Sequence, residues 1–324
     1  MRRRAIISIA GLAGLSGALL IFLPASGLTE AFLLVAAPCA VGIAMLDVSG
    51  GPSAIRLGAA MARKNRQTLF SYKFQLVSLA IYGLVAFSFF ILLGKGLLTN
   101  TLLGANESSV TFLSLAAFGA VLWPILWKSW SMTADSIRME QRSGLLESVL
   151  PTPHGIRSLP LAYFLSNMGT FLPIQAALLA ALVLLMPQDF AGLARPLGML
   201  TFLSVLSLSM ALMWGIGLLF AGLTILHKQL GPVDQILKVF FVGLAGVYVP
   251  IEVLPLWLQE TSRAIPITTS FVYLRDAATV DGALAPPIGL ACITAVALLA
   301  VVAGHFAYIH YVERASDAGR VQGY

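Results

Sequence analysis

The chain has 324 residues, of which 58% are hydrophobic and 10% are charged, and its formal net charge is +6. Apolar runs of about 20 residues recur along it, which is the length that crosses the hydrocarbon core of a bilayer as a helix. This composition excludes an ordinary soluble domain. It predicts a polytopic membrane protein. Because the alternating pattern of membrane strands is absent, we expect an all-α fold.

The sequence predicts eight membrane-spanning helices, at residues 5–23, 29–47, 74–94, 109–132, 160–186, 196–226, 232–249 and 286–311. Most lysines and arginines between them fall on one side of the membrane if the N-terminus is cytoplasmic, as the positive-inside rule requires. We therefore expect a multi-pass protein of a bacterial or archaeal plasma membrane, with both termini in the cytoplasm. The basic and apolar start also has features of a signal peptide, but its long apolar run favours an uncleaved anchor.

Cys39 and Cys292 lie in apolar runs and are expected to fill small spaces in the core. No basic patch is interleaved with aromatic residues outside the predicted spans, so a nucleic-acid partner is not expected.

Four basic residues between the second and third predicted spans fall on one face of a helix: Arg56, Arg63, Arg66 and Lys73. Apolar residues are available for the face toward the lipid. We expect a helix lying in the plane of the cytoplasmic surface, with an ordinary positively charged loop as the alternative. It separates a two-helix hairpin, residues 1–50, from a larger transmembrane domain, residues 51–324.

The segment 250–272 is apolar but interrupted by prolines and charges. We expect a re-entrant or interfacial element on the outer side, because irregular backbone at membrane depth must lie against protein or a water-filled cavity. An amphipathic helix on the outer leaflet is the alternative. Its candidate gate residues are Pro250, Glu252, Pro255, Trp257, Arg263 and Pro266.

The fourth predicted span continues into a polar stretch that ends where Pro151 and Pro153 forbid further helix. The predicted topology places this stretch in the cytoplasm, where a short helix exposes its charges to a soluble partner. The polar stretch is therefore a predicted docking surface.

Two stretches resemble the signatures of ABC type-2 transporter permeases. The first is "MEQRSGLLESVLPTPHGIRSLPLAYFL", from 139 to 165, and the second is "GVYVPIEVLPLWLQETSRAIPITTSFVYLRDA", from 246 to 277. The resemblance covers about residues 53–314. It implies six core spans after an elbow helix, a permease dimer and two cytoplasmic ATPase subunits. We expect a homodimer, with a different second permease as the alternative.

The resemblance also implies that the helix from about 135 to 147 is the coupling helix that docks on the ATPase. Its candidate contacts are Asp135, Arg138, Glu140, Arg142, Gly144, Leu145 and Glu147. The chain lacks a glycine-rich loop ending in Gly-Lys-Ser or Gly-Lys-Thr, so we expect no enzyme activity in it, and ATP and Mg bound by the partner. No metal site is expected either, because His305 and His310 are not spaced to share one helix face.

Lys128 lies within the fourth predicted span, among Trp123, Trp127 and Trp130. Tryptophans gather at membrane interfaces, so the favoured interpretation is a lysine that extends to the cytoplasmic headgroups. The alternative is a pathway residue that meets an anionic substrate entering from the inner leaflet.

The outer loops are short, which favours a hydrophobic or amphipathic substrate, drug-like or lipid-like, over a folded protein. We therefore expect the membrane subunit of an ATP-driven exporter. The alternatives are a polysaccharide or glycolipid permease of the same family, a secondary transporter driven by an ion gradient, and a membrane scaffold. Ion coupling favours buried carboxylates at mid-membrane, and none of the chain's acidic residues falls clearly at the centre of a predicted span.

Overall fold

The computed structural model describes residues 27–71, 108–142, 155–227, 230–248, 251, 255–279 and 286–317. These residues form the α-helices α2 (Gly27–Val48), α3 (Pro52–Ser71), α5 (Ser108–Arg142), α7 (Gly155–Leu185), α8 (Pro196–His227), α9 (Gly231–Leu244), α10 (Leu256–Arg263), α11 (Pro266–Ala278) and α12 (Pro287–Asp317), with a 3₁₀ helix η1 (Ala191–Ala194). No strand occurs in the described part of the chain, as the all-α prediction requires.

Four of the described helices begin at a proline: Pro52, Pro196, Pro266 and Pro287. The first backbone N–H groups of a helix have no partner within it, so a residue without an N–H costs nothing there, and the proline ring already holds a helical φ. These helix starts are therefore set by the local sequence.

A sharp turn joins α2 to α3. Gly50 and Gly51 both have positive φ, 93° and 70°, a conformation that glycine adopts without strain. The Gly51 amide donates to the carbonyl of Leu46 at 2.8 Å, which ends α2. The two helices consequently differ in direction by 92°. The in-plane position predicted for α3 in the membrane stays a prediction.

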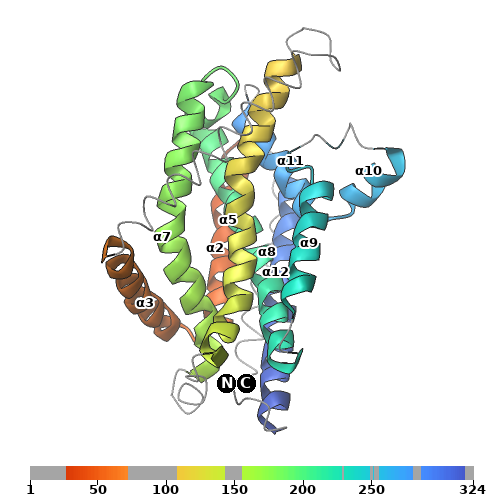
Figure 1. Ribbon diagram of the computed structural model, residues 1–324. Helices are drawn as coiled ribbons and strands as arrows, with labels where there is room; N and C mark the ends of the chain where they lie inside the picture. The colour runs from red at the N-terminus through yellow and green to blue at the C-terminus, as the bar shows by residue number, and fades with distance from the viewer. Residues whose placement is uncertain are drawn as a thin grey trace.

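The helix α3 lies along the lower part of α7 (Figure 1). A Cβ atom added at Gly58 of α3 would stand 3.2 Å from the Cβ of Leu165 and 3.3 Å from the carbonyl oxygen of Ala162, both on α7. The absent side chain at Gly58 therefore lets the two helices approach closely.

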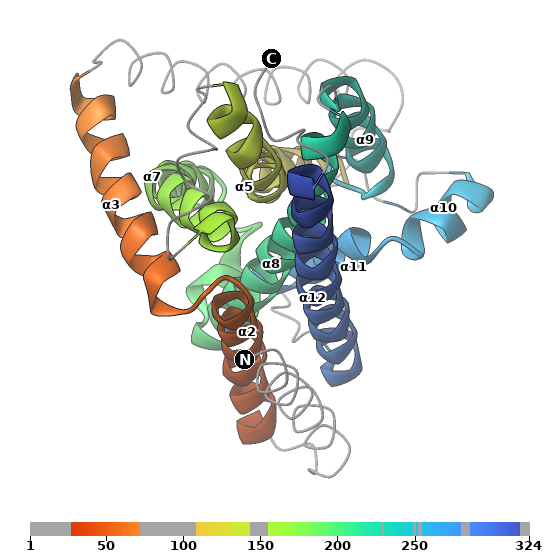
Figure 2. The same cartoon turned by 90° about the horizontal axis from the view of Figure 1, so that it is seen from below.

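The centre of the bundle is α8, which packs against α12, α5, α11 and α2 (Figures 1 and 2). Small residues allow its closest crossing, with α12. A Cβ at Gly304 would lie 2.1 Å from the carbonyl oxygen of Gly215. Such close backbone approach is how membrane helices gain packing contacts without large side chains.

Three described helices contain apolar stretches long enough to cross a bilayer: Ile156–Leu185, Pro196–Ile225 and Pro287–Ala315. The bent pair of α2 and α3 passes the same test as a unit. The chain is thus a helical membrane protein, and the count of eight spans stays a prediction. The spans predicted at 5–23 and 74–94 lie outside the described residues.

The helix α9 is shorter than the span predicted at 232–249. It ends at Leu244, and its 14 residues extend only about 21 Å, less than the ~30 Å of a hydrocarbon core. The backbone leaves the helix at Gly246, whose φ is 67°. The apolar run continues beyond this point, so hydropathy alone places the end too late.

The bundle has two distinct ends, which we call lower and upper after Figure 1. At the lower end α5, α8 and α12 finish, and α7 and α9 begin. At the upper end lie η1, α10 and α11, with α10 projecting to one side. The segments predicted to be cytoplasmic thus meet at the lower end, and those predicted to be external meet at the upper end.

The expectation that both cysteines fill core spaces is wrong: Cys39 and Cys292 are exposed on the described surface. An apolar run in a membrane protein faces lipid as well as protein, so residence in such a run does not place a side chain in the core.

Candidate functional site

The lower half of α5 packs closely against α8 through small residues and residues with hydroxyl groups. Ser129 and Thr133 are buried and donate to carbonyl oxygens one turn back on α5, each at 2.9 Å. Across the interface, a Cβ at Gly217 of α8 would stand 2.7 Å from the carbonyl oxygen of Trp130. Because the Ser129 and Thr133 hydroxyls are satisfied within α5, the two backbones pack closely without leaving these hydroxyls unpaired.

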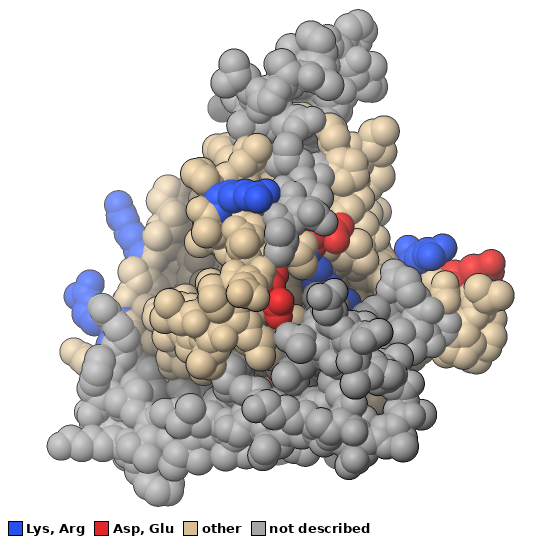
Figure 3. Space-filling model, turned by 90° about the horizontal axis from the view of Figure 1, so that it is seen from above, with Lys and Arg blue, Asp and Glu red and all other residues tan. Residues whose placement is uncertain are grey.

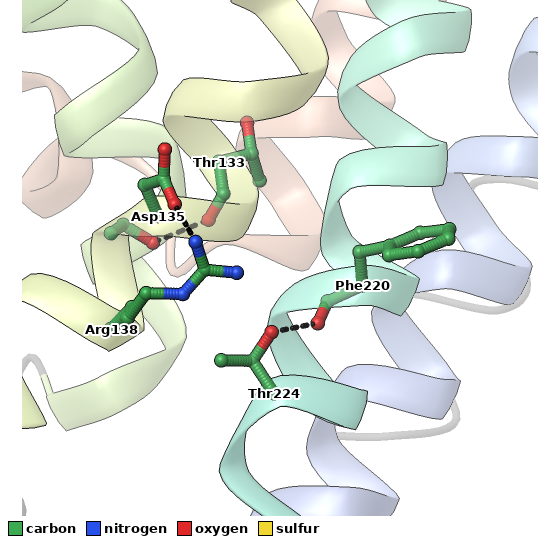
Figure 4. Close-up of polar contacts among 6 residues, drawn as sticks. Thr133, Asp135, Arg138, Phe220 and Thr224 are labelled. Carbon is green, nitrogen blue, oxygen red and sulfur yellow. Dashed lines mark hydrogen bonds and ion pairs between the residues drawn. The ribbon is translucent and has the colours of Figure 1, made fainter. Parts of the chain in front are cut away.

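A pair of opposite charges follows on α5. The Arg138 guanidinium donates to the Asp135 carboxylate at 2.7 Å, with the two residues less than one helical turn apart (Figure 4). The Asp135 side chain is 39% exposed and that of Arg138 20%. Both charges act on Asp234 of α9, as does Lys238 one turn further along α9. We call Asp135, Arg138, Asp234 and Lys238 the lower charged cluster.

Glu140, near the end of α5, faces into the protein. Its side chain is 9% exposed, and its carboxylate accepts a hydrogen bond from the hydroxyl of Tyr163 on α7. This contact ties the lower ends of α5 and α7 together. Leaving such a buried carboxylate without its donor costs about 1–3 kcal/mol or more.

Lys128 and Lys238 each lie over an aromatic ring. The Lys128 ammonium is 5.4 Å from the centre of the Phe171 ring on α7, and the Lys238 ammonium is 5.3 Å from that of Trp127. Trp127 in turn stacks on Trp123 at 5.9 Å. Cation–π contacts of this kind stabilise an ammonium group that is partly removed from water.

At the upper end, the turn after α9 is held by two polar side chains from α10 and α11. Arg275, 9% exposed, donates to the carbonyl oxygen of Val247 at 2.9 Å, and the buried Ser262 hydroxyl donates to the carbonyl oxygen of Leu244. On the other side of the turn, a Cβ at Gly119 of α5 would stand 1.8 Å from the same Val247 oxygen. We call this set, Gly119, Leu244, Val247, Ser262 and Arg275, the upper clasp.

The helix α10 projects outward from this clasp and is exposed. Trp257 is 69% exposed, and Glu260 and Arg263 are also exposed. Seen from above, neighbouring acidic and basic side chains lie at the edge of the molecule where α10 projects (Figure 3). The upper element is therefore anchored at its base and open to its surroundings at its tip.

Comparison with protein families shows to which family the chain belongs. The family model described as "ABC-2 type transporter" matches residues 56–278. The chain belongs to this family. The match begins within α3 and ends at the last residue of α11, so it contains both the lower charged cluster and the upper clasp. A search of curated proteins found no match.

As a member of the ABC-2 type transporter family, the chain is a permease subunit of an ABC transporter. The family resemblance drawn from the two sequence signatures is confirmed. The family also implies association with an ABC ATPase and with the membrane.

Four predicted coupling residues of the permease, Asp135, Arg138, Glu140 and Arg142, lie on α5, which continues without a break from the predicted span. Asp135 and Arg138 are at the surface of the described chain, whereas Glu140 uses its carboxylate internally. Gly144, Leu145 and Glu147 lie outside the described residues. The role of the set in coupling stays a prediction.

The predicted gate residues fall at the ends of the two upper helices of the permease. Pro255 precedes α10, Arg263 ends it, and Pro266 begins α11, while Trp257 lies in the first turn of α10. Pro250 and Glu252 lie outside the described residues. The single interrupted element expected at 250–272 is thus two helices, and its role as a gate stays a prediction.

The favoured interpretation of Lys128, a lysine that extends to the cytoplasmic headgroups, and its alternative, a pathway residue, both stay predictions. Phe171, the ring beneath its ammonium, lies at the middle of the apolar stretch Ile156–Leu185, about 22 Å from its lower end at 1.5 Å per residue.

Sequence reasoning missed the partners that complete these sites. The residues missed are Tyr163, Ser262 and Arg275. Each donates a hydrogen bond to a residue far away in the chain, and the local sequence pattern does not indicate such a partner. Asp234 and Lys238 gave a detectable signal, because opposite charges four residues apart in an apolar helix share one face.

Proposed function

We propose that this chain is the membrane-spanning subunit of an exporter that moves a hydrophobic or amphipathic substrate outward, driven by a separate ATPase subunit. The observation that carries the proposal is the family match across residues 56–278, which includes both ends of α5. The ATPase docks at the lower end, and ATP and Mg bind to that partner.

The physical basis for coupling is the length and continuity of α5. Its 35 residues extend about 52 Å, more than the ~30 Å thickness of the hydrocarbon core. It carries the Asp135–Arg138 pair near one end, and Gly119 lies against Val247 toward the other. Because packed helices move as nearly rigid bodies, a displacement at the lower end is carried to the upper clasp.

The upper clasp then determines how that displacement opens the outer side. Val247 is held both by the close contact with Gly119 and by the hydrogen bond from Arg275. A shift of α5 therefore pushes on the turn after α9 and, through Arg275, on α11. In the proposed cycle this motion changes access to the pathway from the inner side to the outer side.

The proposal is tested by affinity capture of the mildly solubilised permease from its native membrane, followed by identification of an ATPase subunit in the eluate. We expect wild type to retain the ATPase. We expect the single variants Asp135→Arg and Arg138→Asp to retain about tenfold less, corresponding to about 1.4 kcal/mol of binding free energy.

The double variant Asp135→Arg/Arg138→Asp is the matched control. It restores an ion pair within α5, but the positive and negative charges exchange places on the surface that a partner would contact. We expect it to regain thermal stability and still to lose the ATPase. If it recovers the ATPase fully, the pair only supports the helix, and if wild type captures no ATPase under any mild condition, the exporter proposal is wrong and ion-gradient transport or a scaffold role takes its place.

A further inference from the structure

The helix α3 of the permease meets α7 near the level where the hydrocarbon core of a bilayer would end. The apolar stretch of α7, Ile156–Leu185, has 30 residues and extends about 45 Å, which is about 15 Å more than the ~30 Å core. With this stretch centred on the bilayer, the core begins about 7–8 Å above Ile156. Gly58 of α3 lies against Ala162 and Leu165, about 9 Å and about 14 Å above Ile156. The contact therefore places α3 at the boundary between headgroups and acyl chains.

The face of α3 that points away from α7 carries arginines. At about 100° per residue, Arg56 and Arg63 lie about 160° and about 140° around the helix from Gly58, so they share the face opposite the contact with α7. Both side chains are exposed. Figure 3 shows basic side chains at the edge of the molecule where α3 lies, whereas the acidic side chains seen in this view lie elsewhere. The side chains of Arg66 and Lys73, predicted on the same face, lie outside the described part of the chain.

Within the described part of the chain, no carboxylate neutralises these two arginines. The sequences of α3 and α7 contain no acidic residue. Asp47, the acid closest in the sequence, is exposed at the end of α2 and forms no ion pair with Arg56 or Arg63. Glu140 of α5 is buried, and its carboxylate accepts the hydrogen bond from Tyr163. The outer face of α3 is therefore open to an anion from outside the chain.

Depth and charge together indicate the phosphate group of an anionic lipid. A guanidinium group at this level lies beside the headgroups of the inner leaflet, and its planar fork binds phosphate through two parallel hydrogen bonds. Ile55, which is 45% exposed, lies between the arginine face and the contact with α7, about 100° around the helix from Arg56. A helix of this kind binds a membrane surface through its apolar flank and, more strongly when the lipid is anionic, through its basic face.

We propose that α3 binds the headgroups of anionic phospholipids in the inner leaflet through Arg56 and Arg63, and that these lipids hold the helix against α7. The inference concerns the lipid partner of the permease, and it depends neither on the ATPase nor on the substrate. It goes beyond an in-plane position of α3, because a helix held in the plane by apolar contacts alone would be indifferent to the charge of the lipid.

The test compares the full permease in vesicles of phosphatidylcholine and in vesicles of an equal mixture of phosphatidylcholine and phosphatidylglycerol with identical acyl chains. Amide hydrogen exchange is measured in α3 and in α8, the central helix. We expect exchange in Pro52–Ser71 of the wild type to be about tenfold slower in the mixture, with α8 unchanged, because two arginines near an anionic surface raise the free energy of local opening. Exchange in α3 that does not depend on phosphatidylglycerol would overturn the proposal.

Variants separate the two arginines from effects of net charge and of folding. We expect Arg56→Gln/Arg63→Gln to lose the difference between the two vesicles while α8 keeps its protection. Arg56→Lys/Arg63→Lys retains both charges and is expected to keep the difference. Arg195→Gln/Arg314→Gln removes two exposed charges outside α3 and is also expected to keep it. If this last variant loses the difference as strongly as the double glutamine variant of α3, the effect is one of net charge and the proposal fails.

Inorganic phosphate distinguishes a lipid headgroup from a free anion. Added to phosphatidylcholine vesicles at constant ionic strength, it is expected to leave exchange in α3 unchanged, because a free anion is not held at this depth. Slowing by phosphate as strong as that by phosphatidylglycerol would contradict a lipid partner. Slowing that phosphatidylglycerol produces equally in α10, at the upper end, would show a general effect of the bilayer and contradict the site. Because no arm of the test uses the ATPase, failure of ATPase capture would refute the exporter and leave this result standing.

Discussion

At the residue scale, the side chain that Gly119 lacks determines how closely α5 approaches the turn after α9. A Cβ there would stand 1.8 Å from the carbonyl oxygen of Val247, which is too close for any two such atoms. The turn also carries the bond from Arg275, so it has little freedom to withdraw. The absence of a Cβ at Gly119 is therefore a structural requirement of the upper clasp.

This requirement predicts that Gly119→Ala destabilises the protein by about 1–3 kcal/mol, the usual cost of an added carbon in a packed interior. Gly169→Ala is the matched control, because a Cβ at Gly169 meets nothing within 4 Å. In detergent, the midpoint of thermal unfolding should fall for the first variant and hold or rise for the second. Equal midpoints would contradict the close approach at Gly119.

Single residues also show what the sequence leaves open. In the sequence, Glu140 lies beyond the predicted span 109–132 and Arg275 lies between the segment 250–272 and the predicted span 286–311, yet both side chains are 9% exposed. Their positions depend on Tyr163 and Val247, which lie 23 and 28 residues away in the chain. The local sequence pattern does not indicate partners so far away in the chain, so these contacts could not be predicted.

At the element scale, the sequence predicted best the helices that contain a long apolar run. The spans predicted at 160–186, 196–226 and 286–311 correspond to α7, α8 and α12, and two of these begin at prolines. The end of α9 was misplaced because the apolar run continues past Leu244, whereas the helix ends there, just before Gly246 of positive φ, with the Ser262 hydroxyl bonded to the Leu244 carbonyl. The break within 250–272 was predicted from its prolines, but its division into α10 and α11 was not.

The helix α10 offers a test of the upper clasp at this scale. Ser262 donates to the end of α9, whereas the neighbouring Thr261 donates to Trp257 within α10 itself. Removing the first bond frees α10 from its anchor, while removing the second leaves the anchor intact. Elements with few remaining contacts open locally at low free energy.

We therefore expect Ser262→Ala to speed amide hydrogen exchange across α10 by several-fold, about 1 kcal/mol of local stability, with α5 and α8 unchanged. Thr261→Ala should leave exchange in α10 close to that of the wild type. Faster exchange in both variants, or in neither, would mean that Ser262 does not anchor the helix.

At the scale of the whole molecule, the long helix α5 connects the lower and upper ends of the bundle. The lower end of α5 carries the charges proposed to meet an ATPase, and its upper half supports the clasp on which α10 and α11 depend. The family was recognisable from sequence because each of its two signatures is a continuous stretch of the chain. The connection between them was not, since it consists of packing along α5, α8 and α9.

The central claim is that nucleotide at the ATPase moves the upper element through α5. The measurement that tests it most directly is hydrogen exchange of Leu256–Arg263 in lipid vesicles containing the permease and its captured ATPase, with and without ATP and vanadate. The account predicts that nucleotide changes exchange in α10 of the wild type and not in Asp135→Arg. Exchange that responds only at the lower end, with α10 unaffected in the wild type, would contradict it.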